Sequence, residues 1–245
     1  MTMKLSEQLL ETELAEQVKN FVIARCYASI SEVQRQFKLG FNRAARIVDK
    51  LESQGVIAPM NEEGVRLSLI VTDTQQSWWN ALPEIWKKVF ITHLYYKQRI
   101  YSFDMDWYHS LSETELREKT DLIHVLSLKR INIIGDENVT TLPDLSIFPC
   151  LQSLTVRNTG IRDVSQLADC EPLVFLDLAM NQIEDIQPLL QLSCLERLNL
   201  TGNPIADHQL EMQIMAACHQ RREENKKYRK ILEGARVQME KYYDC

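Results

Sequence analysis

ASISEVQRQFKLGFNRAARIVDKLESQGVIAP, residues 28–59, has the pattern of two short helices separated by a turn and followed by the start of a strand. Ser31 and Gln34 have the spacing of a capping box for the first helix, and Gly40 is expected to supply the turn. Gly55 falls where a helix C-terminus favours a left-handed residue. The stretch therefore predicts a helix-turn-helix with the first part of a wing.

The second of these helices has one apolar side and one basic side. At about 100° per residue, the apolar side contains Ala44, Ile47, Val48 and Leu51, and the basic side contains Asn42, Arg43, Arg46 and Lys50. Arginine offers two donors to guanine O6 and N7 in the major groove, and asparagine can pair with adenine or phosphate. We therefore expect DNA contacts from Asn42, Arg43, Arg46, Lys50, Arg35, Lys38 and Arg66.

The amino-acid sequence of this stretch resembles that of the C-terminal gamma domain of FtsK-type bacterial DNA translocases. The family pattern is close to SISxVQRxFxIGYNRAARxIxxxExxGI, and residues 29–57 read SISEVQRQFKLGFNRAARIVDKLESQGVI. The resemblance implies a winged helix that reads short guanine-rich polar DNA sequences and contacts the XerD tyrosine recombinase. It also places Asn42, Arg43 and Arg46 at the DNA-reading positions of the family.

The sequence departs from that family in two respects. The motor domain does not occur in it, and the wing turn at residues 61–64 carries Glu62 and Glu63, with Arg66 as the basic residue that offsets them. Acidic side chains beside a DNA-facing element weaken the case for wing contacts.

The composition is typical of a soluble globular protein. Its 245 residues, 45% hydrophobic and 25% charged, suit one large or two modest domains. No run approaches eighteen apolar residues, and residues 1–20 contain four glutamates where a signal peptide would be basic and then apolar. We therefore expect a cytoplasmic protein.

The six cysteines form no CxxC pair, so reduced packing cysteines are favoured over disulfides or a metal site. Cys150 and Cys194 each precede the first leucine of a repeat, where a small buried side chain is expected. No paired metal ligands accompany them.

The net charge of −6 is unevenly distributed along the chain. Residues 21–60 carry +3, whereas residues 61–207 carry −9. A small basic module on an acidic body is expected to approach DNA by one face, with a strong dependence on salt.

The segments flanking the helix-turn-helix are expected to complete its core. Residues 5–25 read as a helix, residues 65–71 as the returning strand, and the polar residues 72–76 as a domain boundary. The next segment, residues 77–120, is aromatic-rich: Trp78, Trp79, Trp86, Phe90, Tyr95, Tyr96, Tyr101, Phe103, Trp107 and Tyr108. Helical spacing and a lack of basic residues favour a packed core over a stacking platform for single-stranded nucleic acid.

The segment WWNALPEIWKKVF also resembles the helical segment that precedes the first repeat in bacterial leucine-rich-repeat proteins.

A 22-residue period starts at Leu151 and continues at Leu173 and Leu195. The segments LQSLTVRNTGIRDVSQLADCEP, LVFLDLAMNQIEDIQPLLQLSC and LERLNLTGNPIADHQ share the pattern LxxLxLxxNxIxDI. Each unit predicts a short parallel strand and then a turn at Asn181 or Asn203 whose amide bonds to the backbone. A weaker unit, one residue longer, precedes them at Leu128, Ile131, Ile133, Leu142 and Leu145. We expect a leucine-rich-repeat solenoid of about four units, with an irregular turn where Thr159 replaces asparagine.

The strand residues that point away from the core are expected to line a concave sheet in three columns. These are Arg130, Ser153, Phe175 and Arg197; Asn132, Thr155, Asp177 and Asn199; and Ile134, Arg157, Ala179 and Thr201. Exposed aromatic and arginine side chains are common anchors of protein interfaces. We therefore expect protein binding by Arg130, Asn132, Arg157, Phe175, Asp177, Arg197 and Asn199, with a short helix or loop as the target. The alternative is a solvated scaffold, or a face covered by a neighbouring domain.

Residues 208–245 are expected to form a cap and then an extended charged helix. The apolar stripe Leu210, Ile214, Ala217 and Cys218 suits the cap, and RREENKKYRK at residues 221–230 mixes both signs of charge. Solvated charges are favoured over a nucleic-acid-binding tail. Packing on the winged helix or on another copy remains open, and with it a homo-oligomer.

The sequence lacks the motifs of catalysis, cofactor binding and metal binding. It contains no HExxH, P-loop, GxGxxG, GxSxG or paired-cysteine pattern, and Asp104 and Asp106 are not followed by the glycine and glutamate of a calcium loop. We therefore expect neither an enzyme nor a cofactor or metal.

Together these patterns predict an α+β multidomain protein. The expected domains are a winged helix (1–72), an aromatic-rich helical cap (73–120), leucine-rich repeats (121–207) and a C-terminal cap with a long helix (208–245). The leading interpretation is an adaptor that binds guanine-rich duplex DNA and recruits a protein through its repeats. The alternative is a protein adaptor whose winged helix docks a XerD-like recombinase or competes with FtsK, DNA contact being incidental.

Overall fold

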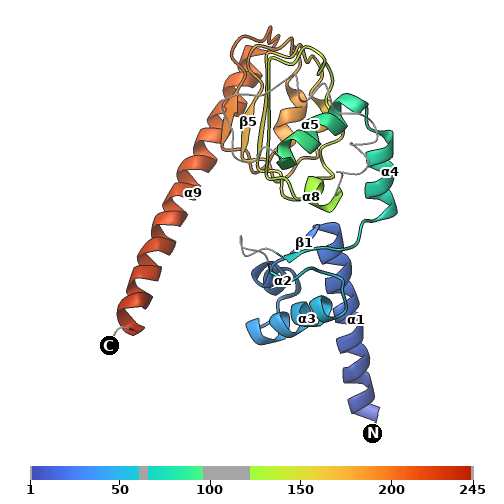
Figure 1. Ribbon diagram of the computed structural model, residues 1–245. Helices are drawn as coiled ribbons and strands as arrows, with labels where there is room; N and C mark the ends of the chain where they lie inside the picture. Colours follow the sequence, from blue (N-terminus) through green and yellow to red (C-terminus); the bar gives the residue numbers. More distant parts are fainter. Residues whose placement is uncertain (1, 61–65, 96–121, 244–245) are drawn as a thin grey trace. The chain divides into compact units, whose positions relative to one another are not determined.

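The computed structural model describes residues 2–60, 66–95 and 122–243, a mixture of helices and strands as predicted (Figure 1). Its contacts divide the chain into two compact units: residues 1–129 with 147–150, and residues 130–146 with 151–245. Within the described residues, no helix is both long and apolar enough to cross a bilayer.

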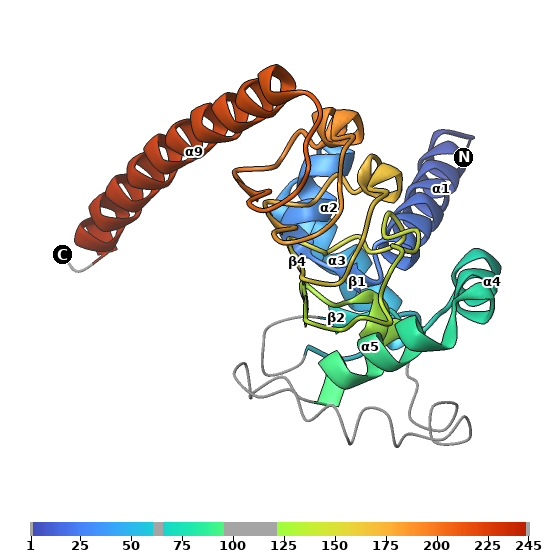
Figure 2. The same ribbon diagram turned by 90° about the horizontal axis from the view of Figure 1, so that it is seen from above.

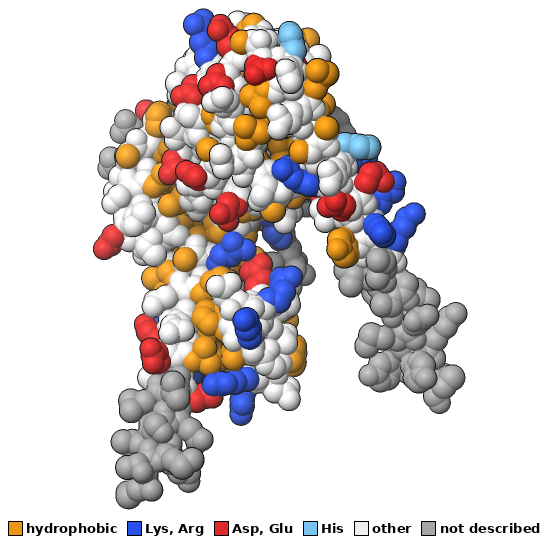
Figure 3. Space-filling model, turned by 180° about the vertical axis from the view of Figure 1, so that it is seen from behind, with side chains coloured by type: hydrophobic (Ala, Val, Ile, Leu, Met, Phe, Trp, Pro, Cys, Tyr) orange, Lys and Arg blue, Asp and Glu red, His pale blue; other side chains and the backbone are white. Residues whose placement is uncertain are grey.

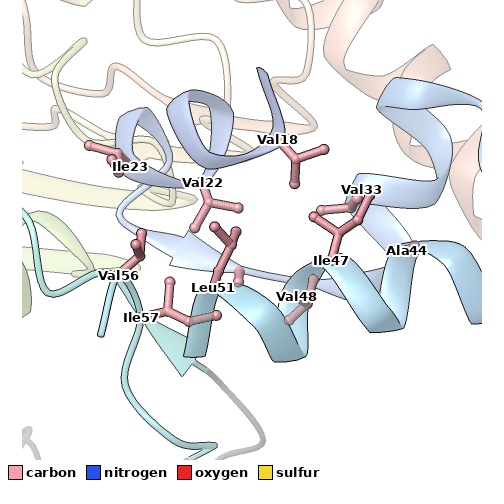
Figure 4. Packing of buried hydrophobic residues seen from close by; sticks show 11 residues of the cluster. Val18, Val22, Ile23, Val33, Ala44, Ile47, Val48, Leu51, Val56 and Ile57 are labelled. Atoms are coloured by element: carbon pink, nitrogen blue, oxygen red, sulfur yellow. The ribbon is translucent and has the colours of Figure 1, made fainter. Parts of the chain in front are cut away.

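The N-terminal part of the first unit consists of three helices and a small antiparallel sheet. The helices are α1 (Thr2–Ala24), α2 (Ile30–Phe37) and α3 (Phe41–Ser53), and the paired strands are β1 (Tyr27–Ala28) and β2 (Arg66–Leu67). Figure 4 shows side chains from all three helices meeting in one core, among them Val22, Val33 and Leu51. The predicted apolar side of α3, Ala44, Ile47, Val48 and Leu51, is buried there. The returning strand is shorter than the predicted 65–71.

The start of α2 corrects the predicted capping box. Ser29, not Ser31, is the N-cap, and its Oγ accepts a hydrogen bond from Glu32 N at 3.4 Å. The left-handed residue between the helices is Lys38, with φ of 52°, whereas Gly40 is extended and precedes α3. Two serines two residues apart leave the sequence ambiguous, and the extended backbone of Ser29 makes it the cap. Gly55, with φ of 70°, is left-handed as predicted.

We expect Ser29→Ala to lower the free energy of unfolding by about 1 kcal/mol, because the substitution removes the side-chain acceptor at the start of α2. Ser31→Ala serves as the matched control, since the exposed Ser31 contacts the Ser29 hydroxyl at 3.2 Å and caps nothing. Denaturant unfolding measures both. Equal losses for the two variants would show that Ser29 is not the cap.

Three further helices complete the described part of the first unit: α4 (Asp73–Ala81), α5 (Glu84–Tyr95) and α8 (Leu122–Leu126). The polar residues 72–76, predicted as a domain boundary, instead begin α4. Thr72 and Gln75 form a reciprocal capping box there. Gln75 is buried, and its Nε2 donates to Cys26 Sγ at 3.3 Å, so this stretch is tied to the first unit.

Aromatic side chains of this part pack together in the core. The ring centroids of Trp78, Trp86 and Phe148 lie 5.8, 5.4 and 5.1 Å from that of Phe90, and Trp86 and Phe90 are fully buried. These contacts confirm core packing for Trp86 and Phe90 and disfavour a stacking platform. Trp79 is partly exposed, and the side chains of the remaining predicted aromatics lie outside the described residues: Tyr95, Tyr96, Tyr101, Phe103, Trp107 and Tyr108.

The second unit contains a four-stranded parallel sheet in the order β3-β4-β5-β6. Its strands are β3 (Arg130–Ile134), β4 (Ser153–Arg157), β5 (Phe175–Asp177) and β6 (Arg197–Asn199). The register joins Ile131, Leu154, Leu176 and Leu198 in one buried row, which confirms the 22-residue period and the longer first unit. Two 3-10 helices, η1 (Ser165–Leu167) and η2 (Gln187–Gln191), occupy the return stretches.

Side-chain amides link successive turns, as predicted. Asn181 Oδ1 accepts from the backbone N–H groups of Thr159, Gly160 and Ile161 at 3.1–3.3 Å, and Asn181 Nδ2 donates to Val156 O at 2.7 Å. Asn203 Nδ2 makes the corresponding bond to Leu178 O at 2.8 Å.

The predicted irregular turn at Thr159 is wrong. Asn158 has φ of 52°, close to the 59° of Met180 and in the same left-handed region as the 80° of Gly202. The turn is regular because the Thr159 hydroxyl donates to Asn181 Oδ1 at 3.0 Å, so Thr159 takes part in the same network that holds the next turn.

Helix α9 (His208–Tyr243) begins beside the last repeat and runs away from it (Figure 2). Ile214 and Cys218 are buried at its start, and Arg221 Nη1 donates to the carbonyl oxygens of Leu192 and Leu195 at 3.0 and 3.2 Å. Through these contacts the start of α9 packs against the last repeat, and the chain continues from there as one helix.

The five described cysteines are free thiols: Cys26, Cys150, Cys170, Cys194 and Cys218. Cys150 is half-buried, but Cys194 is exposed, so its predicted burial is wrong. The chain turns inward one residue later, at the buried Leu195, two residues before β6 begins, and this leaves Cys194 on the outside.

Candidate functional site

The side of α3 that faces away from the core carries exposed polar and basic residues. Asn42, Arg46 and Lys50 are exposed because the apolar side of the same helix is packed against α1 and α2. Arg35 and Lys38 of the α2 region are exposed as well. Figure 3 shows Lys and Arg side chains gathered over this part of the chain. Arg46 has no ion-pair partner among the described residues.

Arg43 is engaged by an acidic residue of α1. Its Nη2 lies 2.9 Å from Glu11 Oε1, and its side chain is 42% exposed. Its Nε is buried and has no hydrogen-bond partner within the described residues. An anionic ligand would therefore have to replace Glu11 at Arg43, whereas Arg46 is available without such an exchange.

Arg66 is held differently from the other predicted DNA-binding residues. Its side chain is only 17% exposed, its Nε donates to Glu52 Oε2 at 2.9 Å, and its Nη2 lies 3.9 Å from Asp49 Oδ1. These ion pairs connect β2 to α3. From the sequence, Arg66 was expected to offset the charge of Glu62 and Glu63, which lie outside the described residues.

The predicted site omitted some exposed residues of α3, among them Phe41 and Asp49. Phe41, the first residue of the helix, is 60% exposed, and the Asp49 side chain is 66% exposed. The signal for Asp49 was its place one residue before Lys50 on the non-apolar side. A carboxylate there can accept a hydrogen bond from cytosine N4.

A polar cluster in the first unit is structural. Tyr27 Oη donates to Glu32 Oε1 at 2.6 Å, and Arg25 Nη2 lies 3.4 Å from the same oxygen.

Burial raises the pKa of Cys26 to about 12 and that of Cys150 to about 11. Both thiols are therefore protonated at neutral pH, which suits packing rather than nucleophilic chemistry or metal binding.

The outward positions of the four-stranded sheet form a second surface, and two of the predicted columns run across all four strands. In the third column the register joins Ile134 to Arg157, whereas Ala179, predicted to be outward, lies beyond the end of β5 and is buried. Arg130 and Arg197 are exposed, and Asn132, Arg157, Phe175 and Asn199 are partly exposed. Asp177, predicted as part of an open binding patch, is 8% exposed. Its Oδ1 accepts from Ala179 N at 3.1 Å, so it stabilises the strand end.

Comparison with known proteins confirms the two predicted resemblances. Residues 10–70 match the family described as the Ftsk gamma domain, and residues 173–209 match the family described as Leucine Rich repeats (2 copies).

The curated relatives match one short stretch of the chain. The DNA translocase FtsK of Haemophilus influenzae is 51% identical over 47 residues, or 19% of this chain and 9% of that protein. The DNA translocases FtsK of Pseudomonas putida and Vibrio vulnificus are each 47% identical over 53 residues, or 22% of this chain and 6% and 5% of those proteins. The chain thus spans less than a tenth of these relatives.

Among solved structures, an internalin from Listeria monocytogenes matches with a TM-score of 0.37 and 20% identity. The match covers 51% of this chain and 32% of the internalin.

Proposed function

We propose that this chain is a non-enzymatic adaptor that binds double-stranded DNA through α3 and a protein partner through its repeats. The observation that carries the proposal is the exposed basic side of α3, with Asn42, Arg46 and Lys50 directed away from a packed core, inside the segment that matches the gamma domain. A recognition helix needs this combination of an anchored apolar side and a free polar side.

The finer architecture is part of the proposal. The antiparallel pairing of β1 with β2, next to the three helices α1–α3, supports a winged helix in residues 1–72. The 22-residue register and the amide-linked turns support a short solenoid in residues 121–207. Residues 73–120 and 208–245 would then cap its two ends, the latter with the long helix α9.

The DNA chemistry follows from the side chains of α3. We propose that Arg46 reads guanine O6 and N7 in the major groove and that Asn42 and Arg43 contact an adjacent base or phosphate. The preferred site would be guanine-rich, of the type implied by the resemblance to FtsK. One such helix binds weakly on its own, so several copies on one site, or a homo-oligomer, would provide useful affinity.

We expect Arg46→Ala to weaken binding to a guanine-rich duplex by about 1–3 kcal/mol, because it removes a two-donor contact to guanine. Arg66→Gln serves as the control, since Arg66 is occupied by Glu52 and Asp49, and should weaken binding by less than about threefold. Fluorescence anisotropy at one fixed salt concentration measures both. Equal affinities for Arg46→Ala and the wild type would show that Arg46 does not contact the DNA.

A second candidate function is protein docking by the same helix, with a XerD-like recombinase or an FtsK-pathway protein as the partner. The exposed Phe41 at the start of α3 favours it, because exposed aromatics are common interface anchors. A pull-down of such a recombinase with and without nuclease separates the two functions. Contacts bridged by DNA disappear on nuclease treatment, and direct contacts stay.

A further inference from the structure

The outward positions of the four-stranded sheet are rich in arginine although the repeats are acidic. Residues 130–207 contain four arginines, no lysine and eleven acidic residues. Three of the arginines, Arg130, Arg157 and Arg197, occupy outward positions. Among the twelve positions that the sequence predicted to point away from the core, Asp177 is the single acidic residue. Positive charge is therefore concentrated on this one face.

The nearby carboxylates are occupied by other groups. Asp177 Oδ2 lies 3.7 Å from Arg157 Nε, and its Oδ1 bonds to the backbone. Glu196, which precedes Arg197, accepts a hydrogen bond from Asn225 of α9 at 2.7 Å. Within the described part of the chain, neither Arg130 nor Arg197 is in an ion pair, and both are exposed.

Phe175 lies in the same row of the sheet as these two arginines. The register joins Arg130, Ser153, Phe175 and Arg197 across neighbouring strands. Strands are about 4.8 Å apart, so Arg130 and Arg197 are about 14 Å apart at their backbones, with Phe175 about 5 Å from Arg197. The row thus presents a cation, an apolar side chain and a second cation.

We propose that this row binds an acidic amphipathic helix of a partner protein. The inference rests on the proposed protein-binding role of the repeats and does not depend on DNA binding. A helix laid across the strands rises about 1.5 Å per residue. A glutamate opposite Arg130, an apolar residue seven positions later over Phe175 and a glutamate eleven positions later opposite Arg197 all lie on one side of such a helix. The spacing of these three helix residues differs slightly from the spacing of the three strand residues, and the long arginine side chains can span that difference.

The same observations disfavour a nucleic acid on this face. A polyanion would extend past the row onto a surface that carries ten other acidic residues in residues 130–207, and like charges there repel it. Phe175 is the one aromatic residue in outward positions and is half-buried, whereas single-stranded nucleic acid is bound by several open stacking surfaces. A short helix with two well-placed carboxylates avoids both costs.

The test uses the full chain and a labelled helical peptide of about twenty residues on an alanine background. The peptide carries Glu, Leu and Glu at relative positions 0, 7 and 11, and matched peptides replace both glutamates by glutamine or by lysine. Anisotropy should show binding of the Glu peptide that weakens with added salt, and at least tenfold weaker binding of the Gln and Lys peptides. Arg130→Gln and Arg197→Gln should each weaken binding of the Glu peptide about fivefold.

Arg162→Gln is the matched control, because Arg162 is the one arginine of residues 130–207 outside the outward positions. It should leave peptide binding unchanged, as should Arg46→Ala, which keeps this test separate from the DNA proposal. Thermal unfolding checks that each variant is folded. The proposal is overturned by no binding of the Glu peptide at millimolar concentration, by equal binding of the Gln peptide, or by equal effects of Arg162→Gln and Arg197→Gln. Stronger binding of a single-stranded oligonucleotide at the same row would assign the face to nucleic acid instead.

Discussion

Replacing Arg43 and Arg46 together by alanine is expected to weaken binding to a guanine-rich duplex about 100-fold or more, or roughly 3 kcal/mol. Arg46 supplies a contact without first losing a partner, whereas Arg43 must exchange Glu11, at 2.9 Å, for the DNA. The two side chains lie about one helical turn apart. The loss of binding free energy in the double variant is therefore not expected to equal the sum of the losses in the two single variants. Anisotropy titrations of both single variants and the double variant measure the effect.

The matched control for this double substitution is Arg222→Ala with Lys227→Ala on α9, which also removes two exposed positive charges. It should weaken binding by less than about threefold if the effect is local to α3. Similar losses for the two double variants would show that the interaction depends on net charge and not on the surface of α3.

Asn181→Ala is expected to lower the free energy of unfolding of the repeats by about 3 kcal/mol. Its side chain is 1% exposed, and it accepts from three consecutive backbone N–H groups, residues 159–161, while donating to Val156 O and Leu178 O. Alanine would remove this partner from the three N–H groups and from Val156 O, whereas Leu178 O would keep its bond from Asn203 Nδ2. Denaturant unfolding followed by far-ultraviolet circular dichroism measures the loss.

Asn225→Ala provides the comparison, because Asn225 is exposed and its side chain, among the described residues, makes one hydrogen bond, to Glu196. Its expected cost is below about 0.5 kcal/mol. A cost under 1 kcal/mol for Asn181→Ala would mean that the turns do not depend on the amide network described here.

Periodic patterns were the part of this fold that the sequence predicted well. The apolar side of α3 and the leucine rows of the sheet follow from repeats of about 3.6, 2 and 22 residues, and each places many side chains at once. The exposure of Asn42 and Arg46 followed from the same pattern, since the opposite side of the helix had to be buried.

The errors fell on features set by single contacts between distant residues. No spacing rule relates Arg66 to Glu52, 14 positions earlier, or Glu11 to Arg43, yet these ion pairs decide which cations remain available. Asp177 was placed in the correct column, but its bond to Ala179 N and its burial depend on the local strand end. The polar residues 72–76 could be read equally as a linker or as a helix start, and the capping bonds of Thr72 favour the helix.

The most direct test of the central claim is the ratio of two dissociation constants measured with the full chain at one salt concentration. One duplex is guanine-rich and of the type that the FtsK resemblance implies, and the other is a scrambled duplex of the same composition. We predict at least tenfold tighter binding to the first, with both affinities falling steeply as salt is raised. Equal affinities for the two duplexes would contradict the claim that α3 reads DNA sequence.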